Sequence, residues 1–159
     1  MAHSGIAIRA VQLGDGPAFF ALRRAAILAG CKHHYPPDTL QRWTDATSEE
    51  RLREPLAAHF YAGFDECMVV SGLLEVGSGR IDALFVAPLR QGEGLGRLMM
   101  RHLESIAQES GLTQLSLHAT LNAAPFYRRL GFKGDTVVGV TSARGVSIAS
   151  VPMNKILRP

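Results

Sequence analysis

Cysteine is scarce in this chain of 159 residues, which holds only Cys31 and Cys67. Two distant cysteines cannot build a disulfide framework, so we expect both to be reduced and mostly buried thiols. No two histidines lie four positions apart, and the neighbours His33 and His34 do not have the spacing of metal ligands. The sequence therefore predicts no metal site.

Long apolar runs are also missing. No segment approaches the roughly 20 apolar residues that cross a membrane. The N-terminus lacks the basic segment followed by an apolar one that is typical of secretion signals, so we expect a cytoplasmic protein with no membrane partner. The formal net charge is only +3 and the basic residues are scattered. This pattern argues against nucleic acid as a partner and suits an anionic ligand.

What is present is the composition of one folded domain. Hydrophobic residues make up 47% of the chain and charged residues 19%, enough apolar side chains for a full core. Repeats, low-complexity tracts and linkers are absent. We therefore expect residues 1–159 to form a single domain.

The segment 80–110 predicts a strand, a glycine-rich turn and a helix. Strand formers run from Ile81 to Val86 and stop at Pro88, while apolar residues recur at helical spacing from Leu95 to a stop at Gly111. Between them lies the turn QGEGLG. A glycine-rich turn that leads into a helix offers unpaired N–H groups and the positive end of the helix dipole. This segment should bind a phosphate or pyrophosphate.

The spacing of the turn excludes two common phosphate motifs. A P-loop needs Gly-Lys-Ser/Thr where this chain has Gly96-Arg97-Leu98, and a dinucleotide fingerprint needs a third glycine where Arg97 stands. The pattern that fits is Gln/Arg-x-x-Gly-x-Gly/Ala, here Gln91, Gly94 and Gly96. With Val86-Ala87-Pro88 ahead of it, the segment resembles the acetyl-CoA loop of the GCN5-related N-acetyltransferases, the GNAT superfamily.

A second segment supports the resemblance. Residues 115–132 read LSLHATLNAAPFYRRLGF, a strand followed by Asn122, a short helix with Phe126 and Tyr127, and Leu130-Gly131-Phe132. This order is similar to the second signature block of the same superfamily. The small single-domain bacterial type is suggested by Tyr35, Leu40, Trp43, Pro152, Met153 and Lys155.

The predicted fold class is α/β (α+β), with a mixed, mostly antiparallel sheet flanked by helices on both faces. The crossover after strand 80–86 is long enough to make strand 113–119 its parallel neighbour, and the resemblance implies that this central pair splays apart. The other expected elements are strand 6–11, a helix capped by Asp15 and ending near Gly30, a helix 39–44 capped by Asp38, a helical turn at 48–51, a hairpin of 59–64 with 67–76, and a closing hairpin of 133–141 with 146–154.

The resemblance implies acetyl-CoA as the cofactor and assigns residues to it. Main-chain groups of Leu84, Phe85 and Val86 would pair with the pantetheine arm, and residues Gln91, Gly92, Glu93, Gly94, Leu95, Gly96 and Arg97 would surround the pyrophosphate. Asn122 and Phe126 would make further contacts. As an alternative or additional role, Asn122 would cap the helix that starts at Ala123.

The same resemblance implies an acid and a base. Acetyl transfer needs an amine that loses its proton and a leaving thiolate that receives one. Tyr127 stands where the family carries the acid, with a place in the core as the alternative. For the base, His118 stands where relatives often carry Glu; Asp82 and then Glu75 are the other candidates, and His118 as a packing residue is the alternative.

The acceptor pocket is expected in the N-terminal part of the chain. Tyr35, Trp43 and His34 are its candidate residues, together with Glu75 and with support from His33 and Phe60. Trp43 as a core residue is the alternative.

The sequence thus predicts an acetyl-CoA-dependent N-acetyltransferase. It would act on a primary amine of a small molecule or protein, by direct attack in a ternary complex, and a homodimer is compatible with this type. The rival functions are a non-catalytic acyl-CoA-binding sensor and a nucleotide-binding regulatory domain; the second is disfavoured by the failed phosphate motifs.

Overall fold

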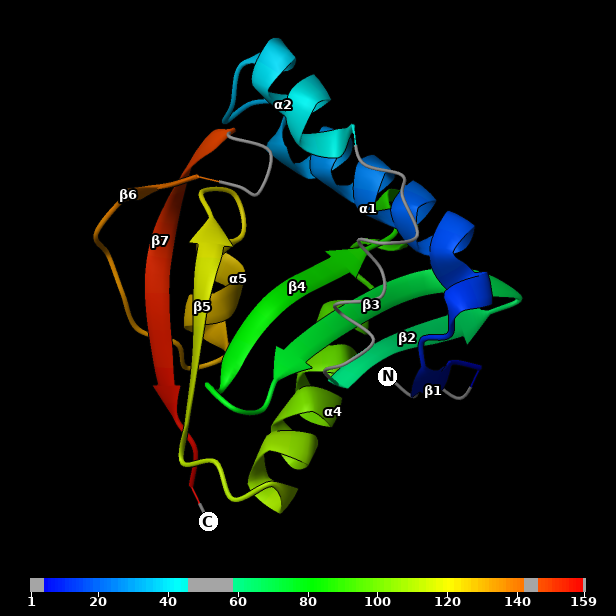
Figure 1. The fold of residues 1–159 in the computed structure, drawn as a ribbon, viewed down its shortest axis with the longest axis vertical. Coiled ribbons are helices and arrows are strands. Elements are labelled where there is room, and N and C mark those ends of the chain that lie inside the picture. The colour runs from blue at the N-terminus through cyan, green and yellow to red at the C-terminus, as the bar shows by residue number, and fades with distance from the viewer. Residues whose placement is uncertain (1–4, 46–58, 142–145, 159) are drawn as a thin grey trace.

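The structure is a computed structural model that describes residues 5–45, 59–141 and 146–158. In this part of the chain a seven-stranded sheet has the order β1-β2-β3-β4-β5-β7-β6 (Figure 1). All neighbours are antiparallel except β4 and β5, which are parallel. The strands are β1 (Ala7–Ala10), β2 (His59–Asp65), β3 (Cys67–Glu75), β4 (Arg80–Val86), β5 (Gln114–Thr120), β6 (Val138–Thr141) and β7 (Ser147–Ile156).

Helices cover both faces of the sheet, as the sequence predicts. In Figure 1, α1 (Gly16–Cys31) and α2 (Pro37–Thr44) lie at its upper side, whereas α4 (Leu95–Glu109) and α5 (Ala124–Arg129) pass behind it. Two short 3-10 turns, η1 (Leu13–Asp15) and η2 (Pro88–Arg90), precede α1 and follow β4. The fold is therefore the mixed α/β architecture expected of the GNAT superfamily.

Strand alternation divides the core between the two faces. On β5, Leu115, Leu117 and Ala119 are buried in a cluster with Met99 and Leu103 of α4, while the residues between them face the other way. A second apolar cluster packs α1 against β2 and β3, and a third joins α1, α2 and β7. The central strands are thus buried from both sides, which makes the sheet a rigid support for the loops at its ends.

The parallel pair separates soon after it forms. Only Arg80 with Ser116 and Ile81 with Leu117 are in register between β4 and β5. Beyond them, β4 stays paired with β3 and β5 stays paired with β7. The predicted splay is therefore confirmed, and it begins at Asp82 on one strand and His118 on the other. From there on, the edge of β4 that faces β5 keeps unpaired backbone groups.

Several expected boundaries differ from the structure. The helix α2 begins at Pro37, whose fixed φ suits the first helical turn, so Asp38 lies inside the helix and does not cap it. The strand expected from residue 133 begins only at Val138, although Lys133 forms one isolated bridge with Asn154. Cys67 is exposed at the start of β3, contrary to the expectation of two buried thiols. The expected helical turn at 48–51 lies outside the described residues.

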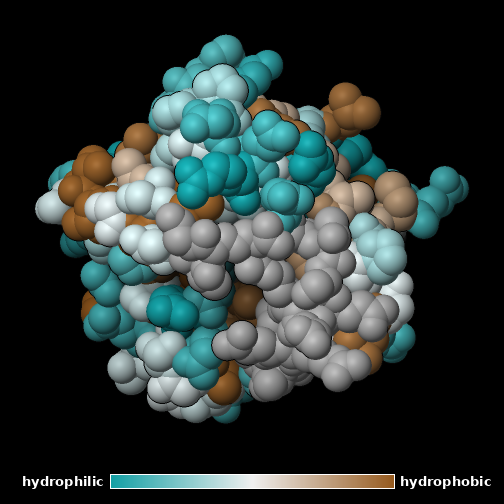
Figure 2. Space-filling view, turned by 45° about the horizontal axis from the view of Figure 1, so that its top comes forward, coloured by the Kyte–Doolittle hydropathy of each residue, from teal (hydrophilic) through white to brown (hydrophobic). Residues whose placement is uncertain are grey.

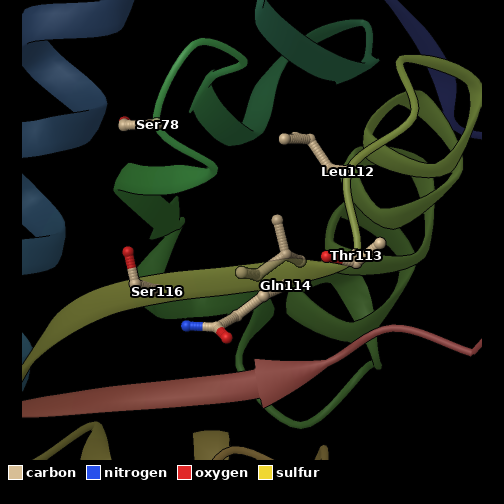
Figure 3. A pocket seen from close by; sticks show the side chains of 6 residues that line it. Ser78, Leu112, Thr113, Gln114 and Ser116 are labelled. Carbon is tan, nitrogen blue, oxygen red and sulfur yellow. The ribbon is translucent and has the colours of Figure 1, made fainter.

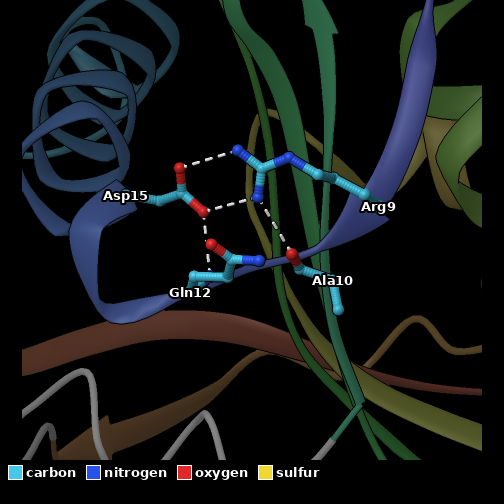
Figure 4. A network of polar contacts seen from close by, with 4 residues as sticks. All are labelled: Arg9, Ala10, Gln12 and Asp15. Atoms are coloured by element: carbon cyan, nitrogen blue, oxygen red, sulfur yellow. Dashed lines mark hydrogen bonds and ion pairs between the residues drawn. The ribbon is translucent and has the colours of Figure 1, made fainter.

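Asp15 precedes α1 but does not cap it with its side chain. Its carboxylate accepts hydrogen bonds from Arg9 at 2.7 and 2.9 Å and from the N–H of Gln12 at 2.8 Å (Figure 4). These bonds, led by that from the Arg9 guanidinium, hold the pKa of Asp15 below its usual value. The residue joins β1 to η1 because a charged partner competes better for a carboxylate than the helix N–H groups do.

Candidate active site

The glycine-rich loop between β4 and α4 has the backbone that its sequence predicts. Gly92 and Gly94 have φ angles of +83° and +81°, and Gly94 is the N-cap of α4. Residues with a side chain rarely adopt this left-handed backbone conformation, which explains why both positions are glycine. The first helical hydrogen bond of α4 runs from the N–H of Leu98 to the carbonyl of Gly94, at 3.0 Å.

The N–H groups of Gly92 and of residues 94–97 are available to a ligand. None of these five donates to a backbone carbonyl of another described residue. Consecutive free N–H groups at the start of a helix of this length attract anions, and the helix dipole adds to that attraction. The loop therefore fits a pyrophosphate.

Arg90 holds the loop from one side, a role that the sequence analysis missed. Its Nε donates to both carboxylate oxygens of Glu93, at 2.8 and 3.0 Å, and its Nη1 donates to Asp65 at 3.0 Å. The side-chain amide of Gln91 donates to the carbonyl of Val86 at 3.4 Å. Glu93 thus directs its charge toward Arg90, which reduces its repulsion of a bound anion. The sequence signal was the spacing of three between Arg90 and Glu93.

Gly96 lets the two signature segments pack together. A Cβ atom added there would lie 3.0 Å from Cζ of Phe126 and 3.5 Å from Cγ2 of Val86. Any side chain at this position would therefore require the Phe126 ring to shift by a few tenths of an ångström. Phe126 therefore lies against the loop, and its contact with the cofactor stays a prediction.

Tyr127 lies in the apolar core on the α4 side, 8% exposed. Its ring makes edge contacts with Phe126 and Phe132, at centroid distances of 5.1 and 5.7 Å. Burial raises the pKa of its phenol well above the usual value. No hydrogen bond joins its hydroxyl to another described residue, so at neutral pH the group is a protonated donor without a fixed acceptor.

The two leading candidates for the base flank the start of the splay. His118 is exposed on β5, next to the last parallel pair. Asp82 occupies the matching place on β4, where its carboxylate accepts a hydrogen bond from Nε of Arg80 at 2.5 Å. His118 and Asp82 thus follow the same end of the parallel pairing on neighbouring strands. Asp82, however, is already bound by the guanidinium group of Arg80.

Asn122 does not cap α5, whose N-cap is Ala123 without a side-chain bond. Its Oδ1 instead accepts a hydrogen bond from the thiol of Cys31, at 3.2 Å. Burial raises the pKa of Cys31 to about 11, although hydrogen bonds to Thr120 and Asn122 act in the opposite direction. The end of α1 therefore rests on the loop between β5 and α5, a contact that sequence spacing did not indicate.

Tyr35 braces the same corner of the molecule. Its hydroxyl donates to the carbonyl of Ala149 at 2.5 Å and accepts from the N–H of Leu121 at 3.1 Å. Trp43, half-buried on α2, lies edge-on to the Tyr35 ring. With its hydroxyl engaged on both sides and its ring 8% exposed, Tyr35 is built as a structural residue and not as the wall of an acceptor pocket.

The remaining acceptor candidates lie apart from each other. His34 is exposed beyond the end of α1. The upper side of the molecule in Figure 1, where α1 and α2 lie, comes forward in Figure 2 and is mainly hydrophilic there. Phe60 is buried in the core beneath α1. Glu75 ends β3, where it accepts hydrogen bonds from the N–H groups of Gly77 and Ser78. That turn lies at the paired end of β4, away from the splay, so the structure does not group Glu75 with the site.

A cavity of about 260 Å³ also lies at the paired end. It is lined by Ser78, Leu112, Thr113, Gln114, Leu115 and Ser116 (Figure 3). None of these side chains titrates near neutral pH, so the cavity offers no acid or base. The described residues contain no group of three or more potential metal ligands and no helix long and apolar enough to cross a membrane.

Comparison with known proteins agrees with this geometry. A model of the acetyltransferase (GNAT) domain matches residues 31–157. An uncharacterised N-acetyltransferase of Escherichia coli K12, YafP, is 30% identical over 131 residues, which are 82% of this chain and 83% of YafP.

Two solved structures share the whole fold. A GCN5-related N-acetyltransferase from Rhodopseudomonas palustris has a TM-score of 0.89 at 25% identity and covers 99% of both chains. The PaiA N-acetyltransferase of Thermoplasma acidophilum, solved in complex with coenzyme A, has a TM-score of 0.79 at 18% identity, over 99% of this chain and 100% of that chain.

Proposed function

The chain belongs to the acetyltransferase (GNAT) domain family, and we propose that it transfers an acetyl group from acetyl-CoA to a primary amine of a small molecule or protein. Acetyl-CoA is its cofactor, and residues 1–159 act as one domain. The observation that carries the proposal is the free edge of β4, which is followed by the unpaired N–H groups of Gly92 and residues 94–97.

The cofactor lies along this path. Main-chain groups of Leu84, Phe85 and Val86 pair with the pantetheine arm. This arm fills the gap beside β4 that opens where β5 diverges. The loop from Gln91 to Arg97 encloses the pyrophosphate, with Arg90 turning the carboxylate of Glu93 aside. Bound acetyl-CoA supplies an activated acyl group, and the chain positions it between the two strands.

Tyr127 supplies the proton that the departing sulfur needs. When the amine nitrogen bonds to the thioester carbonyl carbon and the carbon–sulfur bond breaks, the phenol donates to the thiolate. Burial raises the pKa of Tyr127, so its phenol is protonated at neutral pH and can act as the donor. Its hydroxyl has no competing acceptor among the described residues, so donation breaks no hydrogen bond within that part of the protein.

His118 removes the amine proton, directly or through water. A neutral imidazole can accept this proton on its unprotonated ring nitrogen. Asp82 is the weaker candidate because its carboxylate already accepts a hydrogen bond from Arg80, and this bond would have to break before that oxygen could accept a proton. Trp43 and His34 border the acceptor; Tyr35 and Glu75 are left out because their polar groups are engaged elsewhere.

Release of free thiol from acetyl-CoA, measured against a panel of primary amines, tests this function. We expect turnover with at least one amine. The variant Tyr127→Phe keeps the ring packing and should reduce kcat by about 10²–10⁴-fold, with little change in acetyl-CoA affinity. Acetyl-CoA binding by calorimetry without turnover on any amine would favour a non-catalytic sensor. Full activity of Tyr127→Phe across the pH range would show that sulfur takes its proton from water.

A further inference from the structure

A basic groove lies between α4 and α5, outside the residues assigned above apart from Arg97. It encloses about 200 Å³. Its lining residues are Arg97, Met100, Arg101 and Glu104 of α4, Arg129 and Leu130 at the end of α5, and Lys155 of β7.

The charges of the groove are unbalanced. Glu104 is neutralised by Lys155, whose Nζ lies 2.7 Å from its carboxylate, and both side chains are less than a quarter exposed. Arg97, Arg101 and Arg129 are exposed and form no ion pair or hydrogen bond with another described residue. Elsewhere Arg9, Arg80, Arg90 and Arg128 all have carboxylate partners. Three unpaired guanidinium groups around one concavity make it a site for a strongly charged anion.

The position of the groove identifies that anion. Arg97 belongs to the first turn of α4, directly after the loop that encloses the pyrophosphate. Arg101 lies one turn further on the same side of the helix, about 6 Å along its axis. In coenzyme A the pyrophosphate and a phosphate monoester are attached to the same ribose, at its 5′ and 3′ positions. With the pyrophosphate in the loop, the 3′-phosphate on the same ribose would therefore reach the groove.

We infer that this groove binds the 3′-phosphate of coenzyme A through Arg101 and Arg129, and so selects coenzyme A over its 3′-dephospho form. The inference rests on the proposed function, because it takes the loop as the pyrophosphate site. A phosphate monoester carries nearly two negative charges at pH 7. Planar guanidinium groups bind it with paired hydrogen bonds, and Met100 and Leu130 provide an apolar floor that limits competition from water.

Calorimetry with coenzyme A and 3′-dephospho-coenzyme A tests the inference. Charge-assisted hydrogen bonds of this kind predict that the wild type binds coenzyme A at least about tenfold more tightly. The double variant Arg101→Gln/Arg129→Gln should lose that preference by weakening only the affinity for coenzyme A. The control Arg42→Gln removes an exposed arginine from α2, on the other face of the sheet. This variant should keep the preference for coenzyme A.

The two forms of the ligand separate the possible failures. Equal affinities of the wild type for both forms would overturn the groove assignment and leave the proposed function standing. A preserved preference in the double variant, with an unchanged melting temperature, would overturn the assignment of Arg101 and Arg129. Absence of binding of either form would overturn the groove and the proposed cofactor together.

Discussion

The substitution Tyr35→Phe removes one oxygen atom and tests how the corner next to the site is held. The lost hydroxyl donates to the carbonyl of Ala149 at 2.5 Å and accepts from the N–H of Leu121 at 3.1 Å. These partners belong to β7 and to the residue after β5, so the hydroxyl ties two neighbouring strands to the segment that follows α1. The ring itself stays, and with it the contact to Trp43.

The expected cost follows from the two bonds. Each net hydrogen bond contributes roughly 1 kcal/mol, and a buried group left without a partner costs about 1–3 kcal/mol. Both backbone partners are half-buried, which lets water recover part of the loss. We therefore expect the free energy of unfolding to fall by about 2–3 kcal/mol. For a chain of this length the melting temperature would fall by roughly 4–12 °C.

Tyr61→Phe is the matched control. Its hydroxyl makes one hydrogen bond, with Nδ1 of His59 at 2.9 Å, and the residue is half-buried on β2. Water can replace that bond, so the loss should stay below about 1 kcal/mol. Urea unfolding of the wild type and both variants measures the difference. If Tyr35→Phe costs no more than Tyr61→Phe, the hydroxyl of Tyr35 is not the brace that the structure indicates.

Three further predictions concern the glycine-rich loop, the candidate base His118 and the half-buried His102 of α4. Gly94→Glu places a strained backbone and a negative charge in the anion site, so acetyl-CoA affinity, measured by calorimetry, should fall at least about tenfold. The control Gly111→Glu has the same φ of +81° at the other end of α4 and should leave this affinity unchanged. His118→Gln should lower kcat/KM and flatten its acidic limb; a larger defect in Asp82→Asn would transfer the role of base to Asp82. Burial lowers the pKa of His102, although the charge of Glu109 opposes this shift. Below about pH 6.5 the unfolded chain therefore binds more protons than the folded one, and the free energy of unfolding falls as the pH falls. Urea midpoints between pH 7.5 and 5.5 should decline less in His102→Gln than in the wild type, and parallel declines would contradict this assignment.

Local patterns predicted most of the helices and strands. The strand–turn–helix of residues 80–110, the hairpin across Asp65-Glu66 and the short helix that carries Tyr127 all depend on residues close in the sequence, and the structure has each of them. The positive φ angles of Gly92 and Gly94 follow from the same local chemistry. The length of the crossover also indicated that strand 113–119 is parallel to strand 80–86, because a connection of this length leaves few alternatives.

Local patterns were less reliable wherever a side chain has two possible partners that compete for it. Asp15 looked like a helix cap, but Arg9 and the N–H of Gln12 take its carboxylate. Glu75 looked like a site residue, but the turn after β3 engages it. In each case the side chain had two chemically suitable uses, and the free energy of the closer or charged partner determined the outcome.

The sequence by itself indicated the family and predicted the phosphate loop and the candidates Tyr127 and His118, because motif spacing and backbone preference depend on neighbouring residues. Only the tertiary structure revealed the register at which β4 and β5 separate, which places Asp82 and His118 together. It alone joined Tyr35 to Ala149 and Cys31 to Asn122, across more than 90 residues of chain. It alone gathered the arginines of α4 and α5 around one groove. Such contacts depend on how separate elements pack, and packing is set by the whole core and not by any one segment.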